Sequence, residues 1–263
     1  MVNETKREGD SEMNQPFLPT SASLEAFDLF DRLQRTEGAT GVLFGAPGSG
    51  RSTTLREYAR HEEPGSAVVV PCAPGRGPVQ FLQDLVDRLD PEAWNPVGNA
   101  RSGVRAALRV LRSAETELVL LDDAHRLYKP VLEILEELRE RSGVSLLLSG
   151  PERELTRRLR RVPTLLAAIE RVRTLRPLEA EEVEDVLTLR AVDLRLPRTG
   201  GADLVQDLHL RSGGNWSRLL RLVARCGQEA RSTFRAHVDR RVIHRAAEDT
   251  GLTGQRVVED AEA

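Results

Sequence analysis

A glycine-rich segment that follows a short apolar run constrains the fold of this chain more than any other feature. The apolar run covers residues 40–44, and the segment after it consists of Gly45, Ala46, Pro47, Gly48, Ser49, Gly50, Arg51 and Ser52. The glycines allow successive backbone N–H groups to turn toward an anion, and a helix that starts near Arg51 adds its positive end. The pattern therefore predicts a strand, a phosphate-binding loop and a helix, with a nucleoside triphosphate as the bound anion.

The residues at the end of the loop complete the predicted site, and Arg51 decides how well it works. Ser52 offers a hydroxyl group to a magnesium ion, and Thr53 belongs with the loop residues as part of the predicted nucleotide site. Arg51 stands where a lysine is expected, and its guanidinium group is planar, larger and suited to forked contacts. Because hydrolysis needs a cation at a fixed position in the transition state, we expect Arg51 to impair hydrolysis more than binding.

A second motif supports nucleotide binding. The apolar run at residues 118–121 is typical of a buried parallel strand, and it places Asp122 and Asp123 at its carboxyl end. Asp122 is predicted to hold the magnesium ion, and Asp123 to polarise the attacking water. An aspartate is one methylene shorter than a glutamate, so its oxygens lie about 1.5 Å farther from that water, which slows catalysis. The alternative for Asp123 is a cap for the following turn.

Length and composition agree with a globular nucleotide-binding protein. The chain has 263 residues, 40% of them hydrophobic, which is enough for one substantial core and a small second domain. Cys72 and Cys226 form neither a disulfide framework nor a zinc ribbon, so a cytoplasmic location is expected, with no metal besides Mg²⁺. No apolar run reaches 18 residues and residues 1–15 are polar, so neither a membrane span nor export is expected.

The basic residues are distributed unevenly. Only two of the 38 basic residues are lysines, which a GC-rich genome explains, and the net charge is −3. Residues 208–245 nevertheless contain nine arginines and two acids, so a local basic surface is possible. Its candidates on the last helix are Arg235, Arg240, Arg241 and Arg245, for which a solvated helix face is the alternative to phosphate contacts.

The order of elements predicts an α/β fold with a parallel sheet covered by helices, followed by a small α-helical lid domain. Strands are expected at residues 41–44, 67–70, 118–121, 144–148 and 172–175, and the lid helices at residues 180–195, 202–211, 215–226 and 233–247. The predicted organisation is a disordered arm at 1–16, a P-loop ATPase domain at 17–176, a helical lid at 177–247 and an acidic flexible tail at 248–263.

Two arginines are candidates for sensing bound nucleotide. Arg171, just before the strand predicted at residues 172–175, is placed to complete a neighbouring subunit's site by stabilising charge on the γ-phosphate. Arg218, after Gly213-Gly214-Asn215, is placed to reach over the nucleotide from the lid. For both residues, an ordinary solvated surface charge is the alternative.

With these motifs in view, the chain from about residue 21 to residue 225 resembles the AAA+ ATPases of the MuB, TniB and TnsC group, which regulate DNA transposition. It resembles more distantly the secretion ATPase ExeA and the origin-binding replication initiators. The resemblance is carried by the stretches LLDDAHRL (120–127), LEELR (135–139), SLLLSG (145–150) and IERV (169–172). It implies that ATP binding drives assembly of an oligomer or filament on duplex DNA, which then recruits or activates a transposase.

Several positions depart from the family's pattern. Arg51 replaces its lysine and Asp123 its glutamate, and its polar sensor falls on Ser149 or Pro151. The family's lid arginine falls on Ser217, with Arg218 adjacent. Two other functions stay open: a signalling module whose nucleotide is only a structural ligand, and an ExeA-like export ATPase, although the sequence shows none of the membrane or peptidoglycan-binding segments common in that family.

Overall fold

The structure is a computed structural model that describes residues 17–93, 99–189, 201–233 and 237–252. Several sequence predictions lie outside these residues: the arm at 1–16, the end of the helix predicted at 180–195, Arg235, and the tail beyond residue 252. Within the described residues, no helix is long and apolar enough to cross a lipid bilayer.

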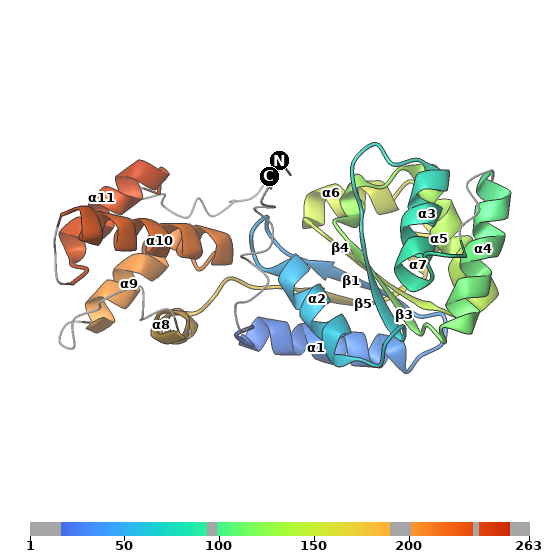
Figure 1. Ribbon diagram of the computed structural model, residues 1–263, viewed down its shortest axis with the longest axis horizontal. Coiled ribbons are helices and arrows are strands. Elements are labelled where there is room, and N and C mark those ends of the chain that lie inside the picture. Colours follow the sequence, from blue (N-terminus) through green and yellow to red (C-terminus); the bar gives the residue numbers. More distant parts are fainter. Residues whose placement is uncertain (1–16, 94–98, 190–200, 234–236, 253–263) are drawn as a thin grey trace, which may run out of the picture.

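Five parallel strands form one sheet in the order β2-β3-β4-β1-β5, and this sheet lies in the right-hand half of Figure 1. They are β1 (Thr40–Phe44), β2 (Ala67–Pro71), β3 (Leu118–Asp122), β4 (Ser145–Gly150) and β5 (Ile169–Thr174). The expected parallel sheet is confirmed. Because β1 and β3 flank β4, the segments that follow β1 and β3 emerge at the same edge of the sheet, one strand apart.

Alternate side chains of the strands pack against helices on opposite faces of the sheet, so both faces are buried. In β3, Leu118 and Leu120 pack on one face with α1 (Ser21–Gln34) and α2 (Arg51–His61), whereas Val119 and Leu121 face the opposite layer. That second layer consists of α3 (Pro78–Leu89), α4 (Ala100–Ser113), α5 (Lys129–Ser142), α6 (Glu152–Leu159) and α7 (Pro163–Ala167). The strands β1, β3 and β4 are therefore central strands with both faces covered, whereas the apolar strand β2 lies at an edge of the sheet.

Two short helices, α6 and α7, were not predicted from the sequence. In α6, only Leu155 and Leu159 are buried, so a single pair of apolar residues four positions apart stands among mostly charged side chains. The strand β5 also differs from the prediction, because it starts at Ile169 rather than at residue 172. Both differences arise where few side chains are buried and the sequence pattern is correspondingly weak.

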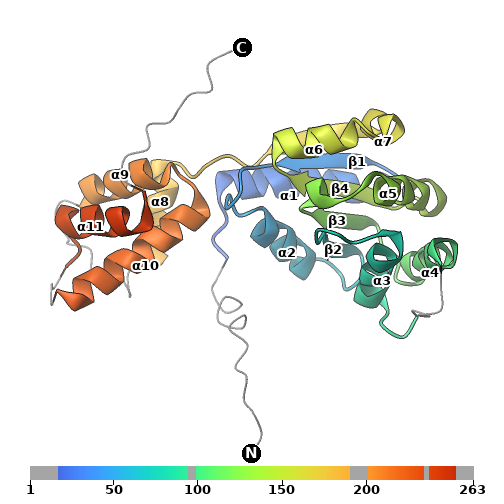
Figure 2. The same ribbon diagram turned by 90° about the horizontal axis from the view of Figure 1, so that it is seen from above.

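The C-terminal helices form a separate core beside the sheet, as Figure 2 shows. They are α8 (Ala180–Leu189), α9 (Gly201–Ser212), α10 (Trp216–Ser232) and α11 (Arg240–Thr250). Leu208, Leu222 and Ile243 are fully buried at their centre. The structure therefore contains the helical lid that the sequence predicts.

The structure corrects the predicted boundary between the last two helices. The single helix predicted at 233–247 is wrong, because α10 continues to Ser232 and α11 starts only at Arg240. Asp239 sets this start, since its Oδ1 accepts a hydrogen bond of 2.9 Å from the backbone N–H of Val242. The helix then extends to Thr250, so the first residues of the predicted tail are helical.

Candidate nucleotide-binding site

The glycine-rich loop lies at the carboxyl end of β1 and leads directly into α2. Gly48 and Gly50 have φ angles of +78° and +97°, a backbone region that side chains rarely tolerate. Gly50 is the N-cap residue of α2 and accepts hydrogen bonds from the backbone N–H and the hydroxyl of Thr54. The predicted strand, loop and helix are therefore all present, with the helix N-terminus at the loop.

Four consecutive carbonyl groups of the loop are held by other parts of the chain. The Arg51 Nη1 donates to the carbonyls of Gly45 and Ala46, the latter at 3.2 Å. From the lid, the Asn215 Nδ2 donates to the Pro47 carbonyl at 3.0 Å, and the backbone N–H of residue 217 donates to the Gly48 carbonyl at 2.9 Å. Because carbonyl contacts fix the loop in this way, the N–H groups at the start of α2 remain for an anion.

Asp122 is a buried carboxylate at the end of β3, only 9% exposed. Its Oδ1 accepts a hydrogen bond of 3.3 Å from the Ser149 hydroxyl, and it forms no ion pair with any residue that the structure describes. A buried carboxylate without a cation is costly, so this position suits Mg²⁺. Of the two sensor positions left open, Ser149 is the one beside Asp122, whereas Pro151 precedes α6 as its N-cap.

Asp123 has a left-handed backbone, with φ +58°, and its side chain contacts three neighbours. Its Oδ1 lies 2.9 Å from the Arg51 Nη2 and 3.8 Å from the His125 Nδ1, and its Oδ2 lies 3.1 Å from the Arg126 Nη2. Burial lowers the pKa of His125, so this imidazole is neutral near pH 7. The alternative role as a side-chain cap is wrong, because the carboxylate caps no N–H of η1 (Ala124–Arg126).

Three buried polar atoms at this site have no hydrogen-bond partner among the described residues. They are the Ser49 Oγ, the Arg51 Nε and the His125 Nδ1. Ser49 fills the space above Gly45, where an added Cβ would approach its hydroxyl to 2.7 Å. Unpartnered buried donors are costly in a closed structure, so these groups fit a bound anion such as a phosphate.

A magnesium ion at this site needs ligands from the nucleotide. The described residues contain no group of three or more His, Cys, Asp and Glu side chains that surrounds a metal position. Mg²⁺ commonly takes one or two protein oxygens and completes its shell with phosphate oxygens and water. Asp122 at the end of β3 and Ser52, which is half-buried in the first turn of α2, are the side chains that the sequence predicts for that role.

The remaining predicted residues lie in different environments. Thr53 is exposed on α2. Arg218 is exposed on α10, and its backbone N–H donates to the Asn215 Oδ1 at 3.1 Å. The lid residues that contact the loop are instead Asn215 and Ser217, whose role the sequence analysis missed. The Gly214-Asn215 pair, which opens α10, was the available signal.

Arg171 lies within β5, at the edge of the sheet and opposite Gly41 of β1. Gly41 precedes the loop by four residues, or roughly 13 Å of extended strand. The side chain of Arg171 is partly buried, and its Nε has no hydrogen-bond partner among the described residues. Arg171 therefore does not contribute to the site in its own chain.

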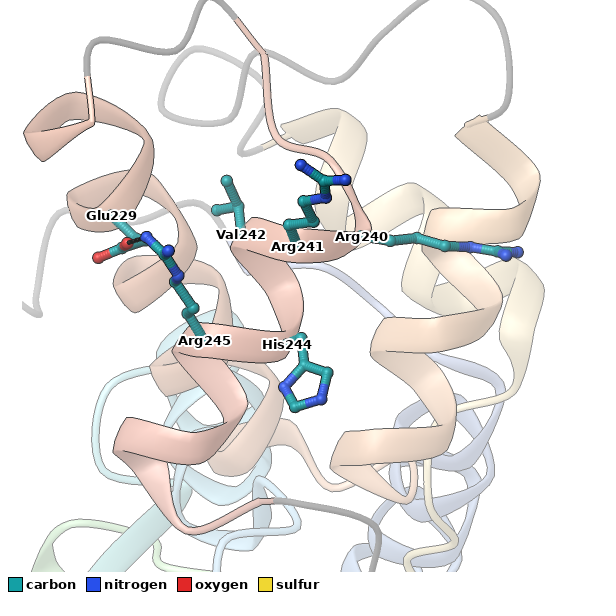
Figure 3. A pocket seen from close by; sticks show the side chains of 6 residues that line it. All are labelled: Glu229, Arg240, Arg241, Val242, His244 and Arg245. Carbon is teal, nitrogen blue, oxygen red and sulfur yellow. Dashed lines mark hydrogen bonds and ion pairs between the residues drawn. The ribbon is translucent and has the colours of Figure 1, made fainter.

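A hollow of about 400 Å³ lies on the lid, away from the loop, and is lined by Glu229, Arg240, Arg241, Val242, His244 and Arg245. Figure 3 shows that its basic side chains point in different directions. Arg245 contacts Glu229 at 3.2 Å and Arg240 contacts Asp203 at 3.3 Å, so two of the arginines already have acidic partners. These residues do not converge on a common ligand.

Comparisons with known proteins agree with this geometry. Residues 34–159 match the family model of an AAA domain. Among solved structures, Cdc6p from Pyrobaculum aerophilum is similar with a TM-score of 0.73 and 16% identity, covering 94% of this chain and 72% of that protein. No curated protein sequence matches the chain.

Two further structures come from Aeropyrum pernix. The ORC2 protein in ADPNP and ADP complexes gives a TM-score of 0.68 and 15% identity, over 92% of this chain and 70% of that one. The ORC1 protein in complex with DNA gives 0.64 and 16%, over 89% and 66%. At such low identity these similarities show the fold alone. The chain therefore has the AAA+ ATPase fold, a five-stranded parallel sheet with a glycine-rich loop after β1, followed by a helical C-terminal region.

Proposed function

We propose that this protein binds ATP with Mg²⁺ between the glycine-rich loop, Asp122 and the start of α10. The observation that carries the proposal is Asp122, a buried carboxylate with no cationic partner among the described residues, one strand away from a loop with unpartnered buried donors. A magnesium triphosphate supplies the missing cation to Asp122 and the missing acceptors to Arg51 and Ser49.

Each residue then has a definite task in the proposed site. The loop and the N-terminus of α2 bind phosphate oxygens through N–H groups, and Ser52 and Asp122 hold the metal. When bound, Mg²⁺ neutralises charge that develops on the phosphates. Asp123 is the carboxylate that orients water, but Arg51 and Arg126 hold its two oxygens. A carboxylate held in this way is poorly placed to polarise water, so we propose slow hydrolysis.

We further propose that bound ATP promotes assembly of a cytoplasmic oligomer or filament on duplex DNA, which recruits or activates a transposase. Support comes from the resemblance to the MuB, TniB and TnsC group and from the similarity in fold to an ORC1 protein in complex with DNA. Arg171 on the edge strand β5 is the proposed residue that reaches the γ-phosphate of a neighbouring subunit, and Arg218 the proposed lid sensor. Contacts with the DNA backbone carry little sequence information, so binding without base specificity is expected.

A second function is a nucleotide-dependent signalling or interaction module with no useful hydrolysis. The contact between Arg51 and Asp123 favours it, because both groups expected to act in hydrolysis are engaged with each other. Duplex DNA separates the two functions, since a signalling module binds nucleotide without assembling on DNA.

Calorimetry with ATP, ADP and Mg²⁺ tests the first proposal, and an absence of heat for well-folded protein would remove it. Gel-shift and light-scattering measurements on duplex DNA test the proposed assembly on DNA. We expect a shift and a larger assembly with ATP, and neither with Arg51→Ala or without nucleotide. A nucleotide-bound monomer that ignores DNA supports the signalling module instead. Co-purification with a transposase encoded beside the gene tests the partner.

A further inference from the structure

Arg51 and Asp123, the two residues that depart from the expected lysine and glutamate, contact each other. The Arg51 Nη2 lies 2.9 Å from the Asp123 Oδ1, and the two side chains are 8% and 24% exposed. Arg51, which is longer than the expected lysine, thus contacts Asp123, which is shorter than the expected glutamate. Such a charge-assisted contact in a largely buried position is stronger than a surface ion pair.

Each partner also has a second contact available when the other leaves. The Arg51 Nε is buried and has no hydrogen-bond partner among the described residues, whereas its Nη1 is bound to loop carbonyls. The Asp123 Oδ2 is held by Arg126 at 3.1 Å. Separation of Arg51 from Asp123 therefore does not leave a buried charge unpaired, which is the usual large cost of breaking such a contact.

A nucleoside diphosphate and a triphosphate make different demands on this arrangement. The free Nε allows the guanidinium to contact a diphosphate while Nη2 stays on Asp123. A γ-phosphate adds further charged acceptors that compete with Asp123 for the guanidinium. Only the triphosphate therefore has to separate the pair.

We propose that Arg51 and Asp123 form an exchange pair that sets the ratio of ATP to ADP affinity: ATP displaces Asp123 from Arg51, whereas ADP leaves the contact intact. The inference rests on the proposed nucleotide binding. It assigns Asp123 a role in distinguishing ATP from ADP, besides its proposed role in hydrolysis. The pair lowers ATP affinity relative to ADP affinity, and Asp123 becomes free of Arg51 only in the ATP state.

The test measures dissociation constants of ATP and ADP by calorimetry for wild type, Asp123→Asn, Arg51→Gln and the double variant. We expect Asp123→Asn to lower the dissociation constant of ATP about five- to twentyfold and to change that of ADP less than about twofold. In the Arg51→Gln background, we expect Asp123→Asn to have little effect on ATP. If Asp123 only repelled the γ-phosphate, the tightening would persist in that background and the exchange pair would be overturned.

Two further variants distinguish a change in nucleotide affinity from a loss of folding. Arg126→Gln changes a side chain that is 44% exposed. It should weaken ATP binding several-fold, because Asp123 then holds Arg51 more firmly. The control is Asp207→Asn in the lid, whose carboxylate is 23% exposed and 2.8 Å from Arg211, and which should leave both affinities unchanged. Equal effects of Asp123→Asn on ATP and ADP would overturn the exchange pair and leave the proposed nucleotide function intact. If neither nucleotide binds to the wild-type protein, both proposals fail.

Discussion

Arginine side chains at the loop site and on α11 lie in contrasting environments. At the loop, Arg51 is 7% exposed and contacts two carbonyls and a carboxylate. On α11, Arg240, Arg241 and Arg245 are exposed and point apart, and two of them meet acids of the lid (Figure 3). The comparison teaches that burial and convergence, rather than the density of positive charge, make a candidate binding site.

The largest expected effect comes from removing one arginine in each region. Arg51→Ala should weaken ATP binding roughly 30- to 100-fold, because it removes charged donors from a buried site and frees the Asp123 carboxylate. Arg241→Ala is the matched control and should change ATP affinity less than about twofold, since this side chain is exposed. Calorimetric titration with MgATP measures both. Equal losses would show that the contrast between the two regions is wrong.

A second experiment restores the expected residues at the loop site. The double variant Arg51→Lys with Asp123→Glu should raise ATP turnover at least about tenfold over wild type, because a compact cation and a longer carboxylate return to positions that catalysis requires. Each single variant should gain less, since the remaining departure still limits the reaction. Phosphate release under saturating ATP measures the rates. No gain in the double variant would show that these two residues do not limit hydrolysis.

A third experiment concerns the contact of the lid with the loop. A Cβ on Gly48 would lie 2.9 Å from the Asn215 Oδ1 and from the Ser217 Cβ, whereas one on Gly50 meets nothing within 4 Å. Both glycines have positive φ, so each alanine costs about 1 kcal/mol of backbone strain. Only Gly48→Ala should also speed hydrogen exchange at the start of α10. Faster exchange in Gly50→Ala to the same extent would argue against direct docking of the lid on Gly48.

The smallest expected effect is a pH dependence of the second contact between lid and sheet domain. The Glu182 Oε1 on α8 accepts a hydrogen bond of 2.7 Å from the backbone N–H of Ser21 on α1. Burial alone would raise the pKa of Glu182, but backbone hydrogen bonds from Glu179 and Ser21 outweigh it, and the pKa is lowered. The carboxylate therefore stabilises the fold above its unfolded-state pKa of 4.5, and this contribution is lost as pH falls through the lowered folded-state value.

Thermal unfolding between about pH 6 and pH 3 measures that effect. Glu182→Gln should flatten part of the pH dependence, while Glu181→Gln, at an exposed neighbouring position, should not. Identical curves for Glu182→Gln and wild type would show that the contact carries no titrating stability.

Much of the sheet domain was predictable because its signals are local. Apolar runs of three or four residues mark β2, β3 and β4, and β3 also brings Asp122 to its carboxyl end. The helices α6 and α7 and the start of α11 were missed or misplaced, because short helices with few buried residues and a cap at Asp239 leave only a weak pattern.

The sequence by itself determined the loop, the acidic strand end and the parallel sheet, since chain order and side-chain spacing fix these features locally. Only the tertiary structure decided that Arg51 lies on Asp123, that Ser149 rather than Pro151 stands beside Asp122, and that Asn215 and Ser217 hold the loop. These contacts join residues from 27 to about 170 positions apart, and the packing of strands, helices and lid sets which of many similar side chains meet.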